Sequence, residues 1–190
     1  MRILFVSGTL LALTLTAALP AHAEINWTQV NQEFGREGAD QPGGVKRYSF
    51  PRSDLKVTVD GVEVKPGLAL GGWLAFQPTT GNDALVVGDL VLLQTEIPAV
   101  TKKLLEGGID VTAIHNHLLR AEPFPMYVHV EGNGDAMKLA RALKDAIALT
   151  KIPAPTPAAA GADPGFNVDT IANAMGRKGT LDGVIYKWWR

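Results

Sequence analysis

The chain has 190 residues, a formal net charge of −1 and no cysteine. Its 18 basic and 19 acidic residues form no long run of one sign, which argues against nucleic acid as a partner. Without cysteine there are no disulfides and no thiolate ligands, so any metal would have to be held by histidine and carboxylate groups.

Residues 1–23 have the features of a secretory signal peptide. The basic residue Arg2 precedes an apolar run over residues 3–19, and the small residues Ala21 and Ala23 fit a cleavage site. A single N-terminal membrane anchor is the alternative. Cleavage would leave a chain of single-domain size in the periplasm or outside the cell, with no further apolar segment that could hold it in a membrane.

The pattern of apolar residues downstream predicts an alternation of helices and strands. Helices are expected over residues 24–38, with Asn26 or Thr28 as the cap, from Thr95 to Gly107, and from Asp135 to about Thr150. Strands are expected over residues 45–50, 55–59, 62–65, 71–77, 84–94, 109–118 and 126–130. The fold class is therefore α+β over residues 24–150, with a mixed, largely antiparallel sheet and flanking helices.

Two glycine-containing segments are read as turns. Gly132-Asn133-Gly134 is expected to end the last strand before the final helix. Asp89 follows Gly88 inside an apolar stretch, and a buried aspartate needs a partner. We therefore expect Asp89 to be a turn residue rather than an acid catalyst.

Residues 151–165 are rich in proline and alanine and are expected to form a linker. Residues 166–179 then repeat the pattern of residues 25–38 at a constant offset of 141, and Gly183-Val184 repeats Gly44-Val45 after a two-residue gap. We interpret residues 166–190 as a partial repeat of the N-terminal helix and strand. It could pack on the first unit or offer a strand to another subunit, which leaves a homodimer open.

Three of the four histidines lie close together in the sequence. His115, His117 and His129 have the spacing H-x-H-(x11)-H, whereas His22 lies in the predicted signal peptide. Side chains alternate along a strand, so His115 and His117 would point to one side. In a hairpin with the loop at residues 119–125, His115 would lie opposite His129, with His117 as its diagonal neighbour. Any pairing with an even sum of residue numbers keeps all three on one face.

Three neutral imidazoles on one face can hold Zn²⁺ and leave a fourth position open. Zn²⁺ is the first choice, and Cu²⁺ is the alternative because all-nitrogen sites bind it more tightly. The competing interpretation is that these are ordinary histidines of a half-buried hairpin.

Two glutamates are candidate catalytic residues for proton transfer. Glu131 should share a strand face with His129, as a fourth ligand or a general base, although an exposed residue at a strand end is the alternative. Glu96 opens a predicted helix, where capping alone would explain it. Arg52 and Asp54 could orient an anionic substrate or form a local salt bridge.

Several segments resemble the LppY/LpqO family of exported bacterial proteins of unknown function. They are Phe50-Pro51-Arg52-Ser53-Asp54-Leu55-Lys56-Val57, Gly88-Asp89-Leu90-Val91-Leu92, Gly108-Ile109-Asp110-Val111-Thr112-Ala113-Ile114-His115-Asn116-His117-Leu118 and Met126-Tyr127-Val128-His129. The resemblance covers nearly the whole chain after residue 23. Members of that family often carry two copies of the unit, which agrees with the partial repeat, but the resemblance implies no reaction.

The histidine pattern is also similar to the zinc site of the acetolactate-decarboxylase-like fold group, which includes a zinc-dependent ester hydrolase. That similarity implies an α+β fold with the metal held by His115, His117 and His129. Hydrolysis of an ester or amide in a small carbonyl substrate is the leading hypothesis, and metal-assisted decarboxylation is the second. The alternatives are a non-catalytic periplasmic carrier of copper or zinc and a purely structural metal.

Overall fold

The structure, a computed structural model, describes residues 24–155 and 163–188. The predicted signal peptide and residues 156–162 of the predicted linker lie outside this part of the chain. Among the helices of the described part, none is long and apolar enough to cross a membrane.

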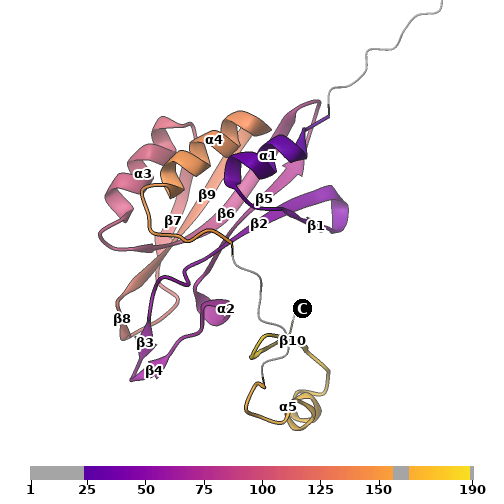
Figure 1. The fold of residues 1–190 in the computed structure, drawn as a ribbon, viewed down its shortest axis with the longest axis vertical. Coiled ribbons are helices and arrows are strands. Elements are labelled where there is room, and N and C mark those ends of the chain that lie inside the picture. The colour runs from indigo at the N-terminus through magenta and orange to yellow at the C-terminus, as the bar shows by residue number, and fades with distance from the viewer. Residues whose placement is uncertain (1–23, 156–162, 189–190) are drawn as a thin grey trace, which may run out of the picture.

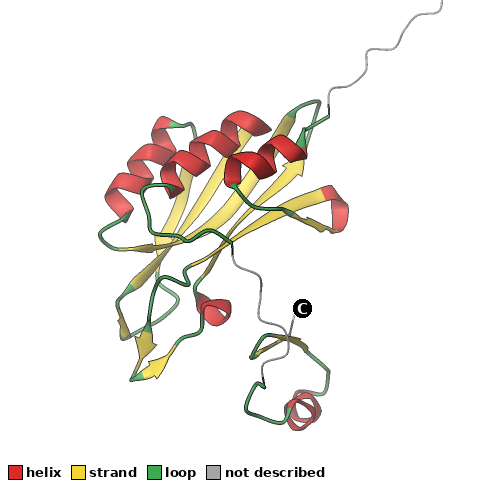
Figure 2. Cartoon of the chain, in the orientation of Figure 1, coloured by secondary structure: helices red, strands yellow, loops and turns green. Residues whose placement is uncertain are grey.

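The described residues form an α+β structure, as expected (Figure 2). The helices are α1 (Trp27–Phe34), the 3-10 helix η1 (Pro42–Gly44), α2 (Pro66–Ala69), α3 (Ile97–Glu106), α4 (Ala136–Ile147) and α5 (Val168–Met175). The strands are β1 (Ala39–Gln41), β2 (Val45–Pro51), β3 (Thr58–Val59), β4 (Val62–Glu63), β5 (Gly71–Pro78), β6 (Asp83–Leu93), β7 (Asp110–His115), β8 (Ala121–Glu122), β9 (Pro125–Asp135), β10 (Thr180–Asp182) and β11 (Ile185–Lys187).

A six-stranded sheet with the order β1-β2-β5-β6-β9-β7 forms the centre of the fold (Figure 1). All of its neighbouring strands are antiparallel. Strands β6 and β9 pair along their full length, from Asp83 opposite Asp135 to Leu93 opposite Pro125. Side chains alternate along each strand, so the two side chains of each pair in this ladder point to the same face of the sheet, and successive pairs point to opposite faces.

Helices α1, α3 and α4 cover one face of this sheet (Figure 1). Helix α1 begins after Asn26, one of the two predicted caps, whose side chain accepts a hydrogen bond from the N–H of Gln29. Its residues Val30 and Phe34 are buried. They join the main hydrophobic core with strand residues such as Leu90 and Val128 from the face beneath the helices.

The opposite face of the sheet is covered over only part of its area. There, Val91 and Tyr127 belong to a second core that includes Val57, Leu70 and Ala121. The small sheet β4-β3-β8 and helix α2 supply this cover. Beyond it Val87 and Glu131 are exposed, so the remainder of this face, called the open face below, meets solvent.

The expected turn at Gly132-Asn133-Gly134 and the expected turn residue Asp89 belong to long strands instead. Strand β9 continues through Gly132 to Asp135, and β6 continues through Gly88 and Asp89. A Cβ on Gly132 would lie 2.7 Å from Ile109 Cδ1, and one on Gly88 would lie 2.5 Å from Leu74 Cδ2. At Gly88 a Cβ would also lie 2.7 Å from the Trp73 carbonyl oxygen, so close packing inside the fold, and not a turn, favours glycine at these positions.

Smaller differences concern the ends of elements. Helix α3 begins after Glu96 rather than Thr95, and no side chain caps it. The strand expected over residues 109–118 ends at His115. Inside the expected loop, β8 pairs with β3, because the chain continues the second core there.

The segment after the linker has the same order of elements as the start of the domain. Asn167 caps α5, as Asn26 caps α1, and Gly176 ends α5 in the left-handed conformation with φ 69°, as Gly35 ends α1 with φ 61°. Strands β10 and β11 then pair as β1 and β2 do. A Cβ on Gly67 of α2 would lie 3.6 Å from Ile185 Cγ1, so β11 passes close to the main unit there.

Candidate metal centre

The three histidines form a cluster on the open face, at the border of the second core. His115 ends β7, His129 is at the middle of β9, and His117 lies two residues beyond β7. Their candidate ligand nitrogens all lie within 4.8 Å of one another. Tetrahedral zinc, with bonds of about 2.0–2.1 Å, separates its ligands by about 3.3 Å, so small side-chain rotations would close the cluster on the ion.

The pairing of β7 with β9 differs from the expected register. His129 lies opposite Ala113, and His115 lies opposite Tyr127. The expectation that His115 faces His129 directly is therefore wrong, although the sum of paired residue numbers at these histidines is even, as the one-face arrangement requires. His115 is instead a diagonal neighbour of His129, with ring centroids 4.8 Å apart.

A β-bulge between Val111 and Ala113 produces this arrangement. On the earlier side of the bulge, Val111 pairs with Val130, whose side chain lies under the helices. Continuing that register without a bulge would turn His115 toward the helices as well. Because the bulge takes up one extra residue, Val111 packs in the core and His115 points to the open face.

His117 owes its position to a ring contact, since it lies outside any strand. Its ring stacks on Tyr127 at a centroid distance of 3.6 Å and an interplanar angle of 16°. The Tyr127 hydroxyl donates a 2.6 Å hydrogen bond to the Ala69 carbonyl, which holds the ring on which His117 stacks in place. Burial, with a contribution from the negative charge of Asp89, raises the pKa of Tyr127 to about 12, so the phenol is neutral at physiological pH.

The pKa of His117 is lowered, chiefly because its ring, stacked on Tyr127, is desolvated on one side although the residue as a whole is exposed. The charge of Asp89 acts in the opposite direction, while His115 and His129 lower the pKa further. The lowered pKa favours the neutral imidazole, which is the form that binds metal.

Asp89 is a residue of this site that sequence reasoning missed. It lies directly opposite His129 on β9 and opposite Trp73 on β5. The side chain is buried, and its Oδ1 atom has no hydrogen-bond partner. The sequence did contain a signal for this role, namely an aspartate inside an otherwise apolar strand. The signal was missed because Asp89 was interpreted as a turn residue. An unpaired buried carboxylate is costly unless a ligand or cation compensates it.

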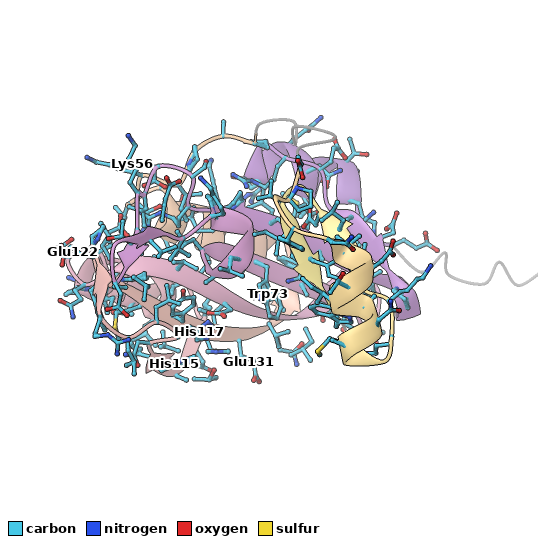
Figure 3. All side chains as sticks on the ribbon, turned by 90° about the horizontal axis from the view of Figure 1, so that it is seen from below. Lys56, Trp73, His115, His117, Glu122 and Glu131 are labelled. Atoms are coloured by element: carbon cyan, nitrogen blue, oxygen red, sulfur yellow. The ribbon has the colours of Figure 1, made fainter. Side chains whose placement is uncertain are left out.

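Of the two glutamates predicted to be catalytic, Glu131 lies near the cluster. It is exposed and occupies the same face of β9 as His129, two residues further on. It lies opposite Val87 on β6 and Asp110 on β7. Figure 3 shows Glu131 on the same side of the sheet as His115, His117 and Trp73.

Glu96 takes part in an ion-pair network. Its carboxylate accepts hydrogen bonds of 2.7 and 3.1 Å from Arg52 and one of 2.8 Å from the Leu93 N–H. Arg52 is fully buried and also donates to both oxygens of Asp54, at 3.0 Å each, and to the Val91 carbonyl. This network joins the end of β2 to the start of α3.

The histidine cluster is accessible from solvent. His117 is exposed, and His115 and His129 are half-buried. Three cavities of about 520, 420 and 350 Å³ lie beside α1 and α4, and no histidine lines any of them. A metal held here would be reached from the open face.

The fold and the site together define an α+β domain with a three-histidine cluster that could hold a metal ion. A family model described as Domain of Unknown Function (DUF1259) matches residues 28–149, and the chain belongs to that family. No curated protein and no solved structure matches the chain.

Proposed function

We propose that this protein is a zinc-dependent hydrolase of a small carbonyl substrate, with the ion held by His115, His117 and His129. The observation that carries the proposal is the buried Asp89 carboxylate, which has an unpartnered oxygen and lies directly opposite His129 on the neighbouring strand. A divalent cation in the cluster would compensate this charge. Copper is the alternative metal, because it binds nitrogen sites more tightly.

The sequence resemblances support the proposal. The similarity of the histidine pattern to the zinc site of the acetolactate-decarboxylase-like group favours carbonyl chemistry, with decarboxylation as the second reaction. The features of residues 1–23 and the resemblance to exported LppY/LpqO proteins support a periplasmic or secreted location.

When bound, zinc would polarise a carbonyl and lower the pKa of water to near 7. The three imidazoles would hold the ion in their neutral form. Asp89 would accept a proton at its free Oδ1 atom and return it to the leaving group. Glu131, exposed on the same face, is the second candidate for proton transfer.

The proposal is tested by replacing His117 with alanine, because this side chain is exposed and lies outside the strands. We expect His117→Ala to fold but to lose stoichiometric zinc, measured by elemental analysis, together with hydrolysis of 4-nitrophenyl acetate. Asn116→Ala, at the neighbouring position, is the control and should keep both. Zinc retained at full stoichiometry in His117→Ala would overturn the metal assignment.

A non-catalytic metal carrier is the second candidate, and the exposure of His117 favours it. A carrier would give up its ion readily to a chelator and would show no turnover with any carbonyl substrate. Slow release of zinc together with turnover that depends on Asp89 would support the hydrolase.

A further inference from the structure

Arg47 differs from the other arginines of the described residues. The side chains of Arg36, Arg52, Arg120 and Arg141 each form a hydrogen bond or an ion pair within the protein, and Arg177 also has an interaction partner. Within the same part of the chain, the side chain of Arg47 has neither a hydrogen bond nor an ion pair, and its Nε atom is buried without a partner. Its cross-strand neighbours Ala39 and Ala75 have no polar side-chain group to offer.

The contact that the structure gives Arg47 is with Trp73. The guanidinium carbon lies 4.7 Å from the centroid of the indole ring, within the range of a cation–π contact. A guanidinium that contacts only a ring keeps its N–H groups for a planar or tetrahedral oxyanion. Both side chains are half-buried, so a small molecule can reach them.

A continuous row of side chains joins Trp73 to the metal centre. Trp73 lies opposite Asp89, and Asp89 lies opposite His129, so the three occupy adjacent strands on one face. Neighbouring strands are about 4.8 Å apart, which places β5 about 10 Å from β9. Figure 3 shows Trp73 on the same side of the sheet as His115, His117 and Glu131.

We infer that Arg47 and Trp73 form the binding subsite for a terminal oxyanion of the substrate, whose carbonyl end is held at the histidine cluster. The inference rests on the proposed function and names its substrate class: small molecules with a reactive carbonyl at one end and a carboxylate or phosphate at the other. The oxyanion supplies the partner that Arg47 lacks, and the indole supports the connecting carbon chain.

Binding measurements test this subsite without relying on turnover. Calorimetry on the zinc-loaded chain would compare adipate, 5-phosphonopentanoate and the neutral adipamide. We expect Arg47→Met to weaken binding of at least one anionic probe about 10-fold or more, the size of a lost charge-assisted hydrogen bond. Adipamide should change less than about two-fold on the same scale. Adipate and 5-phosphonopentanoate distinguish a carboxylate from a phosphate substrate.

Two further variants separate a specific subsite from a general effect of charge. Arg47→Lys keeps the charge but not the planar contact with Trp73, so we expect only part of the affinity to return. Arg120→Met removes an exposed arginine that pairs with Asp60 and should leave the binding of all three probes unchanged.

The outcomes distinguish this inference from the proposed function. If the chain binds zinc but each probe binds Arg47→Met as tightly as it binds the wild type, the subsite alone is overturned. If the chain binds no zinc, the proposed function is overturned. If adipate still binds to the zinc-free chain and Arg47→Met weakens that binding, the subsite is supported. Equal weakening of all three probes, with a lowered melting temperature, would show that Arg47 acts only through the fold and would also overturn the subsite.

Discussion

Asp89 and His129 lie directly opposite each other on the paired strands β6 and β9. The pairing places a buried carboxylate oxygen without a hydrogen-bond partner beside a histidine of the three-histidine cluster. In the metal-free protein, burial of this carboxylate costs desolvation free energy and lowers the stability of the fold. A bound divalent cation would offset that cost. Metal binding and the charge of Asp89 should therefore be linked.

Replacing Asp89 with asparagine tests this link. Without metal, Asp89→Asn should melt at a higher temperature than the wild type, because an unpaired buried charge is removed. The rise in melting temperature on adding zinc should be smaller in the variant, and hydrolysis should fall about 100-fold or more if Asp89 transfers protons. Asp110→Asn, at an exposed strand position, is the control. A variant with the same metal-dependent shift and activity as the wild type would contradict the role of Asp89.

The Arg52 network gives a prediction about stability. Arg52→Met would leave the carboxylates of Asp54 and Glu96 without their buried cation, and we expect a loss of about 3–5 kcal/mol in the free energy of unfolding. Urea unfolding monitored by tryptophan fluorescence measures the change. Arg120→Met removes an exposed arginine with a similar two-oxygen contact to Asp60, and its unfolding curve should overlay that of the wild type. Similar losses in the two variants would show that burial does not decide how much each arginine contributes to the free energy of unfolding.

Packing at Gly132 predicts the effect of a single methyl group. In Gly132→Ala the new Cβ would lie 2.7 Å from Ile109 Cδ1 and 3.0 Å from Leu139 Cδ2, between the sheet and α4. We expect a loss of about 1–3 kcal/mol in the free energy of unfolding, typical of overpacking. Gly67→Ala, whose nearest neighbour would be 3.6 Å away, should have little effect on the melting temperature. A wild-type melting temperature for Gly132→Ala would contradict the close-packing explanation.

The contact between α1 and α4 predicts a pH dependence. The hydrogen bond from Lys144, at 3.0 Å, is the main reason that the pKa of Glu33 lies below its ordinary value of 4.5, and the nearby Arg141 adds to the effect. A carboxyl whose pKa is lowered by folding stabilises the native state above its unfolded pKa, and this stability is lost as the pH falls through the folded pKa. Glu33→Gln should therefore be less stable than the wild type near neutral pH, by no more than about 1 kcal/mol because the pair is close to solvent.

Urea unfolding of Glu33→Gln and the wild type at about pH 7 and about pH 3 measures this difference, which should shrink at the lower pH as Glu33 becomes protonated. Glu106→Gln, which disrupts an exposed pair with Lys102 on α3, is the control and should show little difference at either pH. A difference for Glu33→Gln that is the same at both pH values would contradict the assignment to charge.

The sequence by itself determined the features that depend on local pattern. Hydrophobic spacing and a cap at Asn26 or Thr28 predicted α1, and apolar segments between turn residues predicted strands β2, β5 and β6, because these preferences act between neighbours in the chain. The count and spacing of His115, His117 and His129 pointed to one cluster. The α+β class followed from the mixture of such elements.

The tertiary structure decided which residues face one another. The bulge at residues 111–113 sets the face of His115, and it depends on how β7 fits against β9 and the helices at once. Gly88 and Gly132 are strand residues because neighbouring side chains leave no room for a Cβ, a fact that no local pattern records. Asp89 became a site residue, and Glu96 a partner of Arg52, because strands and loops far apart in the sequence meet in the folded sheet.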